Sequence, residues 1–344
     1  MILFLSKYPV LDEEFRDGFY QRVENIDNFF RDDERTYLNI SLFKNAKKQL
    51  RKVDKRTELS CNFFLHFFTI YKLFQRSNIV YIQSIFNALS ALLFIMFLDK
   101  KYILDVHGVV PEELDMQGKK LKSKIFNFVE KLIFRKLNIA ITVTNRMTNH
   151  YSNKYKNSNC KFIEYAILPS HLKKYDVPVM SSSCVEVIYS GNAQVWQNVD
   201  MMLKIIKKNL NANIHYTILT GDLNTFEKKI IDYGIDPNSI TLKSVQPTEL
   251  EDYYKKSHYG FVLRDDILVN NVACPTKIVE YLNYGIIPIV LSENIGDFKE
   301  LGYEYLSIND FNHNVAKRKS LNNTEVIKLI YAKNNINLRN FIFS

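Results

Sequence analysis

The sequence is poor in cysteine, glycine and proline. Its four cysteines, Cys61, Cys160, Cys184 and Cys274, lie far apart and form no CxxC pair, so their spacing encodes neither a disulfide framework nor a zinc knuckle. Glycine and proline together make up 18 of the 344 residues, about 5% where about 12% is typical, which argues against long flexible linkers. These features favour a folded protein of a reducing cytosol.

Long apolar runs are also missing. The longest, Phe86 to Leu98, covers 13 residues, whereas a helix needs about 20 to cross a bilayer, so we interpret it as a buried helix. The run Ile2 to Leu5 follows Met1 without a basic segment and soon meets polar residues, unlike a signal peptide. We therefore expect a cytoplasmic protein.

The positive charge is confined to the first half of the chain. The net charge is +9, and residues 1–168 hold 27 Lys/Arg and 18 Asp/Glu, whereas residues 169–344 hold 19 of each. Basic residues alternate with apolar ones in Lys44–Arg56, Lys119–Lys124 and Lys131–Lys136. This pattern suits an anionic membrane surface, and a plain solvated surface is the alternative. We expect no nucleic-acid partner, because no RNA- or DNA-binding motif accompanies the charge.

Short β-rich runs alternate with helical segments along the whole chain. We predict strands at 2–7, 35–43, 78–84, 101–107, 138–144 and 160–166, and a second series at 185–191, 214–221, 239–245, 259–264 and 287–291. The intervening helices include 15–30, 62–76, 86–98, 111–137 and 275–284. This rhythm predicts two doubly wound α/β domains: residues 1–168, a linker at 169–183, residues 184–322, and a carboxyl-terminal helix at 323–344 that returns to the first domain.

The segment from Tyr259 to Val290 carries the strongest chemical signal. A buried strand ends near Arg264, and a helix is predicted to begin with Cys274 as its cap and Pro275 at its first position. The free amides of Thr276 and Lys277 would favour an anion there, such as a diphosphate. Glu280 follows one turn later on the same face, where a carboxylate can accept hydrogen bonds from a ribose diol.

Three segments resemble motifs of bacterial GT-B glycosyltransferases of the family 4 type, and they occur along this chain in the same order as in that family. PTKIVEYLNYGIIPIV, from Pro275, is similar to their PTKxxEYLAxGxPVI segment. DVHGVVPE, from Asp105, resembles their DxHGxxPE loop, and YSGNAQVWQ, from Tyr189, resembles the YxGxxxxWQG start of their second domain. The resemblance spans residues 1 to about 310, and only the PTK segment is specific by itself.

The resemblance implies a GT-B fold, in which two Rossmann-like doubly wound domains face each other across a cleft. It also implies transfer of a sugar from a nucleotide-diphosphate donor with retention of anomeric configuration. Arg264 would neutralise the departing diphosphate, and His107 would contact the donor sugar. The implied catalytic residues are His107, Arg264 and Glu280, and the implied donor-binding residues are Gly191, Asn192, Arg264, Asn270, Asn271, Pro275, Thr276, Lys277 and Glu280.

The acceptor side is assigned to the first domain. Asp105 is expected to orient the imidazole of His107, and Gly108 permits close approach of a ligand to the backbone. Glu112 is expected to have only a secondary role there, because an acidic residue in the first turn of a helix also stabilises the helix itself. Gly18 and Arg22 belong to a loop and helix that resemble the acceptor side of the family.

The chain departs from the family pattern at Val272, which occupies the place of the first Glu of an EX7E motif. Asn270 or Asn271 could replace its contacts to the donor sugar. The pair Asp265-Asp266 is adjacent rather than a DxD motif. We therefore expect no metal and no cofactor besides the nucleotide sugar.

These observations predict a glycosyltransferase that uses a UDP- or GDP-sugar and acts on a glycan or a polyprenyl-linked acceptor in bacterial surface-polysaccharide synthesis. It would be cytoplasmic and could be peripheral at the inner face of the membrane. Two alternatives remain: a nucleotide-sugar 2-epimerase of the same architecture, and a non-catalytic partner of a synthase that binds a nucleotide sugar.

Overall fold

The computed structural model describes residues 1–344 except 12–13, 15–16, 167–171, 173–182, 335 and 344. The chain divides into two compact units, Met1–Ala166 with Asn334–Ser344, and Ile167–Lys333. The linker predicted at 169–183 falls almost entirely outside the described residues. Each unit has its own sheet and its own apolar core.

The first unit is built on an eight-stranded sheet with the order β3-β4-β2-β1-β5-β6-β7-β8. Its pairs are parallel except for β3 with β4, as expected for strands joined by helical crossovers. The strands are β1 (Ile2–Leu5), β2 (Arg35–Ser41), β3 (Gln49–Val53), β4 (Arg56–Asn62), β5 (Ile79–Gln83), β6 (Lys101–Asp105), β7 (Ile139–Thr142) and β8 (Lys161–Glu164).

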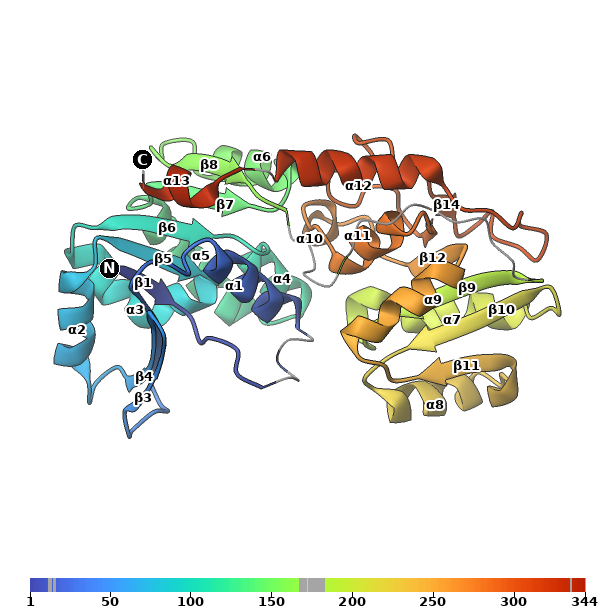
Figure 1. The fold of residues 1–344 in the computed structure, drawn as a ribbon, viewed down its shortest axis with the longest axis horizontal. Coiled ribbons are helices and arrows are strands. Elements are labelled where there is room, and N and C mark those ends of the chain that lie inside the picture. The colour runs from blue at the N-terminus through green and yellow to red at the C-terminus, as the bar shows by residue number, and fades with distance from the viewer. Residues whose placement is uncertain (12–13, 15–16, 167–171, 173–182, 335, 344) are drawn as a thin grey trace. The chain divides into compact units, whose positions relative to one another are not determined.

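Helices cover this sheet (Figure 1). They are α1 (Gly18–Asn28), α2 (Phe67–Arg76), α3 (Ser84–Phe97), α4 (Val110–Met116), α5 (Lys120–Phe134), α6 (Asn145–Lys154) and α13 (Leu338–Phe343). The single helix predicted over 111–137 is therefore wrong. The chain turns at Gly118, where φ is +74°, a left-handed conformation that glycine adopts without steric cost.

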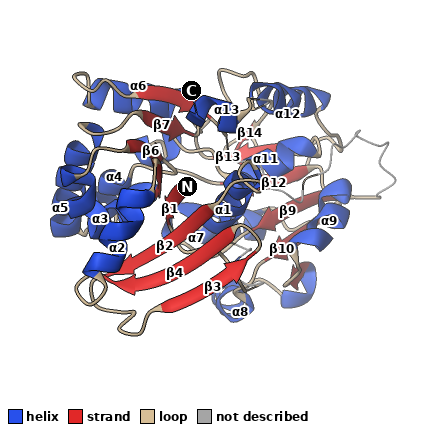
Figure 2. Cartoon of the chain, turned by 60° about the vertical axis from the view of Figure 1, so that its left-hand side comes forward, coloured by secondary structure: helices blue, strands red, loops and turns tan. Residues whose placement is uncertain are grey.

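The first unit also contains two strands that were not predicted and one expectation that is corrected. The basic segment Lys44–Arg56 contains β3 and runs into β4, and these strands form an antiparallel ribbon at one edge of the sheet (Figure 2). Helix α3, expected to be buried, exposes Phe86, Leu93 and Phe97. The periodicity of a run without charges gives no sign of which face meets solvent, so the sequence could not show this.

The second unit holds a six-stranded parallel sheet with the order β11-β10-β9-β12-β13-β14. The strands are β9 (Val185–Ser190), β10 (Ile214–Leu219), β11 (Ile240–Lys243), β12 (Tyr259–Val262), β13 (Ile287–Val290) and β14 (Leu306–Ser307). Its helices are α7 (Val199–Lys208), α8 (Leu223–Asp232), α9 (Leu250–Lys256), α10 (Leu268–Asn271), α11 (Thr276–Asn283) and α12 (Leu321–Lys333), with a 3-10 turn at Val195–Gln197.

The carboxyl-terminal segment differs from the predicted single helix at 323–344. Helix α12 belongs to the second unit, and only the chain from Asn334 onwards belongs to the first. There Leu338 and Ile342 are buried in the apolar core, and Arg339 pairs with Asp33 at 2.8 Å. Among the residues that the structure describes, no helix is both long enough and apolar enough to cross a lipid bilayer.

Candidate functional site

The first turn of α11 lies next to the loop that follows β9. Pro275 is the cap and Thr276 the first helical residue, so the helix begins one residue later than predicted. The amides of Thr276 and Lys277 are at positions that have no partner within a helix. They remain available to an anion, which the helix dipole also attracts.

The Lys277 side chain crosses from this helix to the end of β9. Its amine lies 3.8 Å from the centre of the Tyr189 ring and donates a hydrogen bond to Oε1 of Gln197 at 2.9 Å. A Cβ atom at Gly191 would lie 3.0 Å from this amine, and φ of Gly191 is +149°. Glycine alone fits this position without strain, because the backbone conformation disfavours a side chain and an added Cβ would displace the Lys277 amine.

The Lys277 amine is in an environment that disfavours its positive charge. Burial lowers its pKa well below the ordinary value of 10.5, the nearby Arg264 lowers it further, and Glu280 raises it. An anion bound here would reverse this effect, because an opposite charge stabilises the ammonium form. The site is therefore electrostatically suited to a group such as a diphosphate.

Glu280 is held from the opposite side by α9. Its Oε2 accepts a hydrogen bond of 2.6 Å from the hydroxyl of Tyr254, which in turn lies 2.8 Å from Oγ of Ser190. Burial and then Glu280 raise the pKa of Tyr254 well above its ordinary value, so the phenol stays protonated and donates. Glu280 is thus a buried, oriented carboxylate one turn from the start of α11.

Arg264, at the end of β12, is positioned by α10. Its Nη1 donates to Oδ1 of Asn270 at 3.3 Å, and Nδ2 of Asn270 donates to the carbonyl of Asp265 at 2.9 Å. Asn270 is buried, so its amide links the arginine to the backbone. Asn271 donates to Asp266 at 2.7 Å, and its buried Oδ1 has no hydrogen-bond partner among the described residues. Val272 is buried as well.

Asn192 completes the loop after β9 mainly through its backbone. The hydroxyl of Tyr189 donates to its carbonyl at 2.5 Å, and its Oδ1 accepts from the amide of Gln194 at 3.3 Å. The side chain is exposed. Within the described parts of the chain, His, Cys, Asp and Glu side chains form no group of three that could hold a metal ion.

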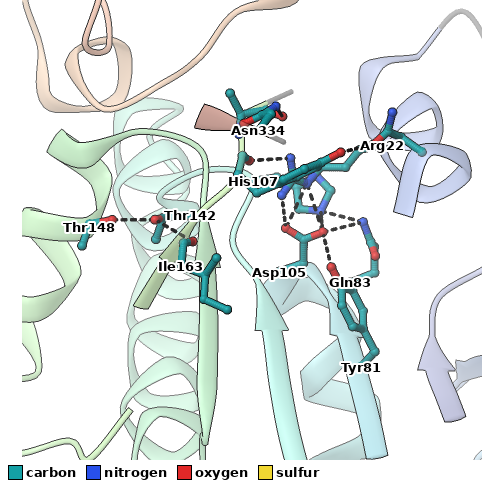
Figure 3. A network of polar contacts seen from close by, with 12 residues as sticks. Arg22, Tyr81, Gln83, Asp105, His107, Thr142, Thr148, Ile163 and Asn334 are labelled. Atoms are coloured by element: carbon teal, nitrogen blue, oxygen red, sulfur yellow. Dashed lines mark hydrogen bonds and ion pairs between the residues drawn. The ribbon is translucent and has the colours of Figure 1, made fainter. Parts of the chain in front are cut away.

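A second polar cluster surrounds Asp105 at the carboxyl end of β6 in the first unit (Figure 3). Arg22 donates from Nε and Nη2 to this carboxylate, at 2.9 and 2.8 Å, and both side chains are fully buried. The hydroxyl of Tyr81 donates to Oδ2 at 2.8 Å. Burial by itself would raise the pKa of Asp105, but neighbouring positive charge, that of Arg22 above all, holds the pKa below its ordinary value.

Gln83 joins Asp105 to His107. Its amide nitrogen lies 3.2 Å from Oδ2 of Asp105 and 2.8 Å from Nε2 of His107. One NH2 group can donate to both; in the tautomer that accepts this hydrogen bond, Nε2 is the acceptor and the ring proton lies on Nδ1. The ring also stacks on Phe19, with centroids 5.1 Å apart. Oδ2 of Asp105 lies 3.5 Å from Nε2, and because both atoms accept in this arrangement, Asp105 acts on His107 through the amide of Gln83 rather than directly.

The remaining predicted acceptor-side residues are placed around this cluster. Gly18 is the first residue of α1, whose cap Asp17 accepts from the amide of Phe19. A side chain at Gly108 would collide with the carboxylate of Glu113. Glu112 pairs with Lys154 at 2.8 Å; burial alone would raise its pKa, but His150 and Lys154 lower it to about 2. Glu112 therefore belongs to an ion cluster between α4 and α6.

Sequence reasoning missed three residues that organise these sites, Gln83, Gln197 and Tyr254. Gln83 ends β5 and lies one residue before the end of the strand predicted at 78–84, and the carboxyl ends of parallel strands are where α/β sheets bind ligands. That position was the one available signal. Gln197 ends the segment YSGNAQVWQ quoted above, but nothing in that segment indicated its contact with Lys277, 80 residues away. Tyr254 approaches Glu280 from 26 residues away, and no local pattern marks it.

A scan against protein-family models and a search of curated proteins give no match. Solved structures of GT-B glycosyltransferases match the whole chain. Sucrose-phosphate synthase from Thermosynechococcus elongatus has a TM-score of 0.69 and 11% identity, covering 99% of this chain and 97% of that one. Anabaena HepE in complex with UDP and glucose has a TM-score of 0.64 and 10% identity, covering 100% and 99%.

A third match, trehalose 6-phosphate synthase from Burkholderia multivorans, has a TM-score of 0.57 and 9% identity and covers 99% of this chain and 95% of that one. Staphylococcus aureus TarM, solved with UDP, matches 80% of this chain but only 52% of its own length, with a TM-score of 0.51 and 13% identity. The chain therefore has the GT-B fold with two Rossmann-like α/β domains, which confirms the predicted fold class.

Proposed function

We propose that the chain is a glycosyltransferase of the family 4 type that takes its sugar from a UDP- or GDP-sugar bound by the second domain. The observation that carries this proposal is the grouping of Lys277, Arg264 and the first amides of α11 beside the oriented carboxylate of Glu280. Cationic side chains and amides match a diphosphate, and a carboxylate matches the adjacent ribose diol. HepE and TarM, which share the fold, were solved with UDP.

In the proposed reaction an acceptor hydroxyl attacks the anomeric carbon, and the bond from that carbon to the diphosphate oxygen breaks. Arg264 and Lys277 stabilise the charge that develops on the diphosphate, so we propose that no metal ion is required. An oxygen of the departing diphosphate takes the hydroxyl proton on the same face, which retains the anomeric configuration. No protein carboxylate acts as a nucleophile.

His107 would meet the donor sugar from the first domain. With Nε2 accepting from Gln83, Nδ1 carries the proton and is the atom that can donate to a sugar hydroxyl. We propose that the acceptor is a glycan or a polyprenyl-linked glycan of a bacterial surface polysaccharide. Such a lipid acceptor would bring the cytoplasmic enzyme to the inner face of the membrane.

The test is incubation of the protein with a panel of nucleotide sugars, with and without candidate acceptors. A transferase releases nucleoside diphosphate in an acceptor-dependent manner, a 2-epimerase converts the nucleotide sugar without an acceptor, and a binding partner does neither. We expect Arg264→Ala to lower kcat by about 100- to 1000-fold and Glu280→Ala to reduce activity to near background. Glu227→Ala, an exposed residue of the same domain, is the matched control. Full activity of both site variants would contradict the proposal.

A further inference from the structure

Helix α3 leaves an apolar face uncovered. Phe86, Leu93 and Phe97 recur at helical spacing on the side opposite the buried Ala88 and Ala91, and Phe97 is 80% exposed. None of the 14 residues of this helix is charged. A helix that faces water normally carries charged or polar residues on its outer side, so this face is suited to contact with something other than water.

The neighbouring helix α5 has an exposed apolar stripe of its own. Leu121, Ile125 and Phe128 recur at intervals of four and three residues, and Leu121 is 74% and Phe128 61% exposed. The two helices pack side by side (Figure 2), with the ring of Phe86 4.9 Å from that of Phe126. We call the combined surface the apolar helical face; its residues are Phe86, Leu93, Phe97, Leu121, Ile125 and Phe128.

The exposed charges of α5 and its two ends all have one sign. Between residues 119 and 136 the one acidic residue is Glu130, which is buried and pairs with Lys154 at 2.7 Å. It therefore contributes no negative charge at the surface. The exposed basic residues of this segment are Lys119, Lys120, Lys122, Lys124, Lys131 and Arg135.

We propose that the apolar helical face and these basic residues dock on an anionic lipid bilayer. Exposed apolar side chains enter the boundary between headgroups and acyl chains, and flanking lysines pair with anionic headgroups. A second copy of the chain is a poorer occupant, because a symmetric contact through this face would bring two positively charged α5 helices together. A nucleic acid would match the lysines but leave the apolar side chains in water. The inference does not depend on the proposed transferase activity.

The experiment is flotation of the full-length protein with vesicles of phosphatidylcholine alone or of phosphatidylcholine with 30–40% phosphatidylglycerol. We expect binding to the anionic vesicles only. The charge variant K120Q/K124Q should weaken the partition coefficient by about 25-fold, since each basic residue near the surface contributes roughly fivefold. The apolar variant F97S/F128S should abolish flotation at physiological salt. All four positions are exposed, and thermal melts identify any variant that fails to fold.

Two double variants in the second domain are the matched controls. I231S/L329S removes exposed apolar side chains, K208Q/K228Q removes exposed lysines, and both should float like the unsubstituted protein. Absence of flotation, equal flotation with neutral vesicles, or full flotation of F97S/F128S would each overturn the proposal. Binding to a nucleic acid that K120Q/K124Q loses and F97S/F128S keeps, without vesicle binding, would assign the surface to that partner instead. A dimer that F97S/F128S dissociates, without vesicle binding, would assign it to a second copy.

Discussion

The amine of Lys277 rests 3.8 Å above the ring of Tyr189, in the space that a side chain at residue 191 would need. The two residues are 88 positions apart in the sequence, and the pairing of α11 with the end of β9 brings them together. This contact buries a lysine whose charge is not favoured until an anion arrives. The next two predictions follow from this contact.

Gly191→Ala should weaken nucleotide binding. The added Cβ would lie 3.0 Å from the Lys277 amine and 3.3 Å from the Tyr189 hydroxyl, and the residue would keep a φ of +149°, so the lysine must move. We expect at least a tenfold rise in the Kd for nucleoside diphosphate by calorimetry. Gly221→Ala is the control, because a Cβ there meets nothing within 4 Å. Equal affinities of Gly191→Ala and Gly221→Ala for nucleoside diphosphate would contradict the assignment of the nucleotide site to the loop at Gly191.

Nucleotide binding should be accompanied by proton uptake. The pKa of Lys277 is depressed in the free protein, and a bound diphosphate would raise it, so the amine gains a proton between these two pKa values. Calorimetry in buffers of different ionisation enthalpy should show proton uptake on binding at a pH that lies between these two values, below the ordinary lysine pKa of 10.5. Lys277→Gln should abolish this uptake and Lys228→Gln should leave it unchanged. Uptake that survives in Lys277→Gln would assign the proton to another group.

Gln83→Leu should impair the turnover of the proposed reaction more than donor binding. Without the amide that donates to Nε2 of His107, the ring can place its proton on Nε2, toward Asp105, and lose the Nδ1 donor. We expect a fall in kcat of about tenfold or more with a shifted pH profile. Gln75→Leu, at an exposed position in α2, is the control. An unchanged kcat and pH profile would exclude the positioning role.

The buried pair of Arg22 and Asp105 should dominate the stability of the first domain. Asp105→Asn leaves the guanidinium of Arg22 buried without its anion, and breaking such a pair costs about 3 to 5 kcal/mol of unfolding free energy. Glu325→Gln, which breaks an exposed pair with Lys328, should leave denaturant unfolding unchanged. A small effect of Asp105→Asn would mean that water or another anion reaches Arg22.

The second domain should lose stability as the pH falls from 7 to 4.5. Burial, followed by the charge of Lys319, lowers the pKa of His258 from 6.5 to about 4, and its buried Nε2 has no partner among the described residues. The unfolded chain therefore takes up a proton that the folded protein does not, which reduces the unfolding free energy by about 2 kcal/mol. His258→Gln should flatten this dependence, whereas the exposed His313→Gln should not. Parallel curves of unfolding free energy against pH for the unsubstituted protein and for His258→Gln would contradict this prediction.

The sequence was sufficient for the repeating α/β pattern and for the segment around Pro275, because both are local. Alternating apolar runs set the strands, and Pro275 followed by Thr276 and Lys277 indicates a helix start within one residue of its place. The ribbon of β3 and β4 was not predictable. Its turn uses a non-glycine residue, Asp54, at φ +51°. Strand β3 is largely exposed, and β4 has a mixed rather than an apolar sequence.

The sequence by itself determined the order of helices and strands along the chain and the kinds of side chain that a site can use. The tertiary structure decided which of them meet: Gln83 with His107, Gln197 with Lys277, and Tyr254 with Glu280. It also decided that α3 would turn an apolar face to the outside. The physical reason is that periodicity is a property of neighbours along the chain, whereas side-chain contacts and burial depend on which segments the sheets and helices bring together in space.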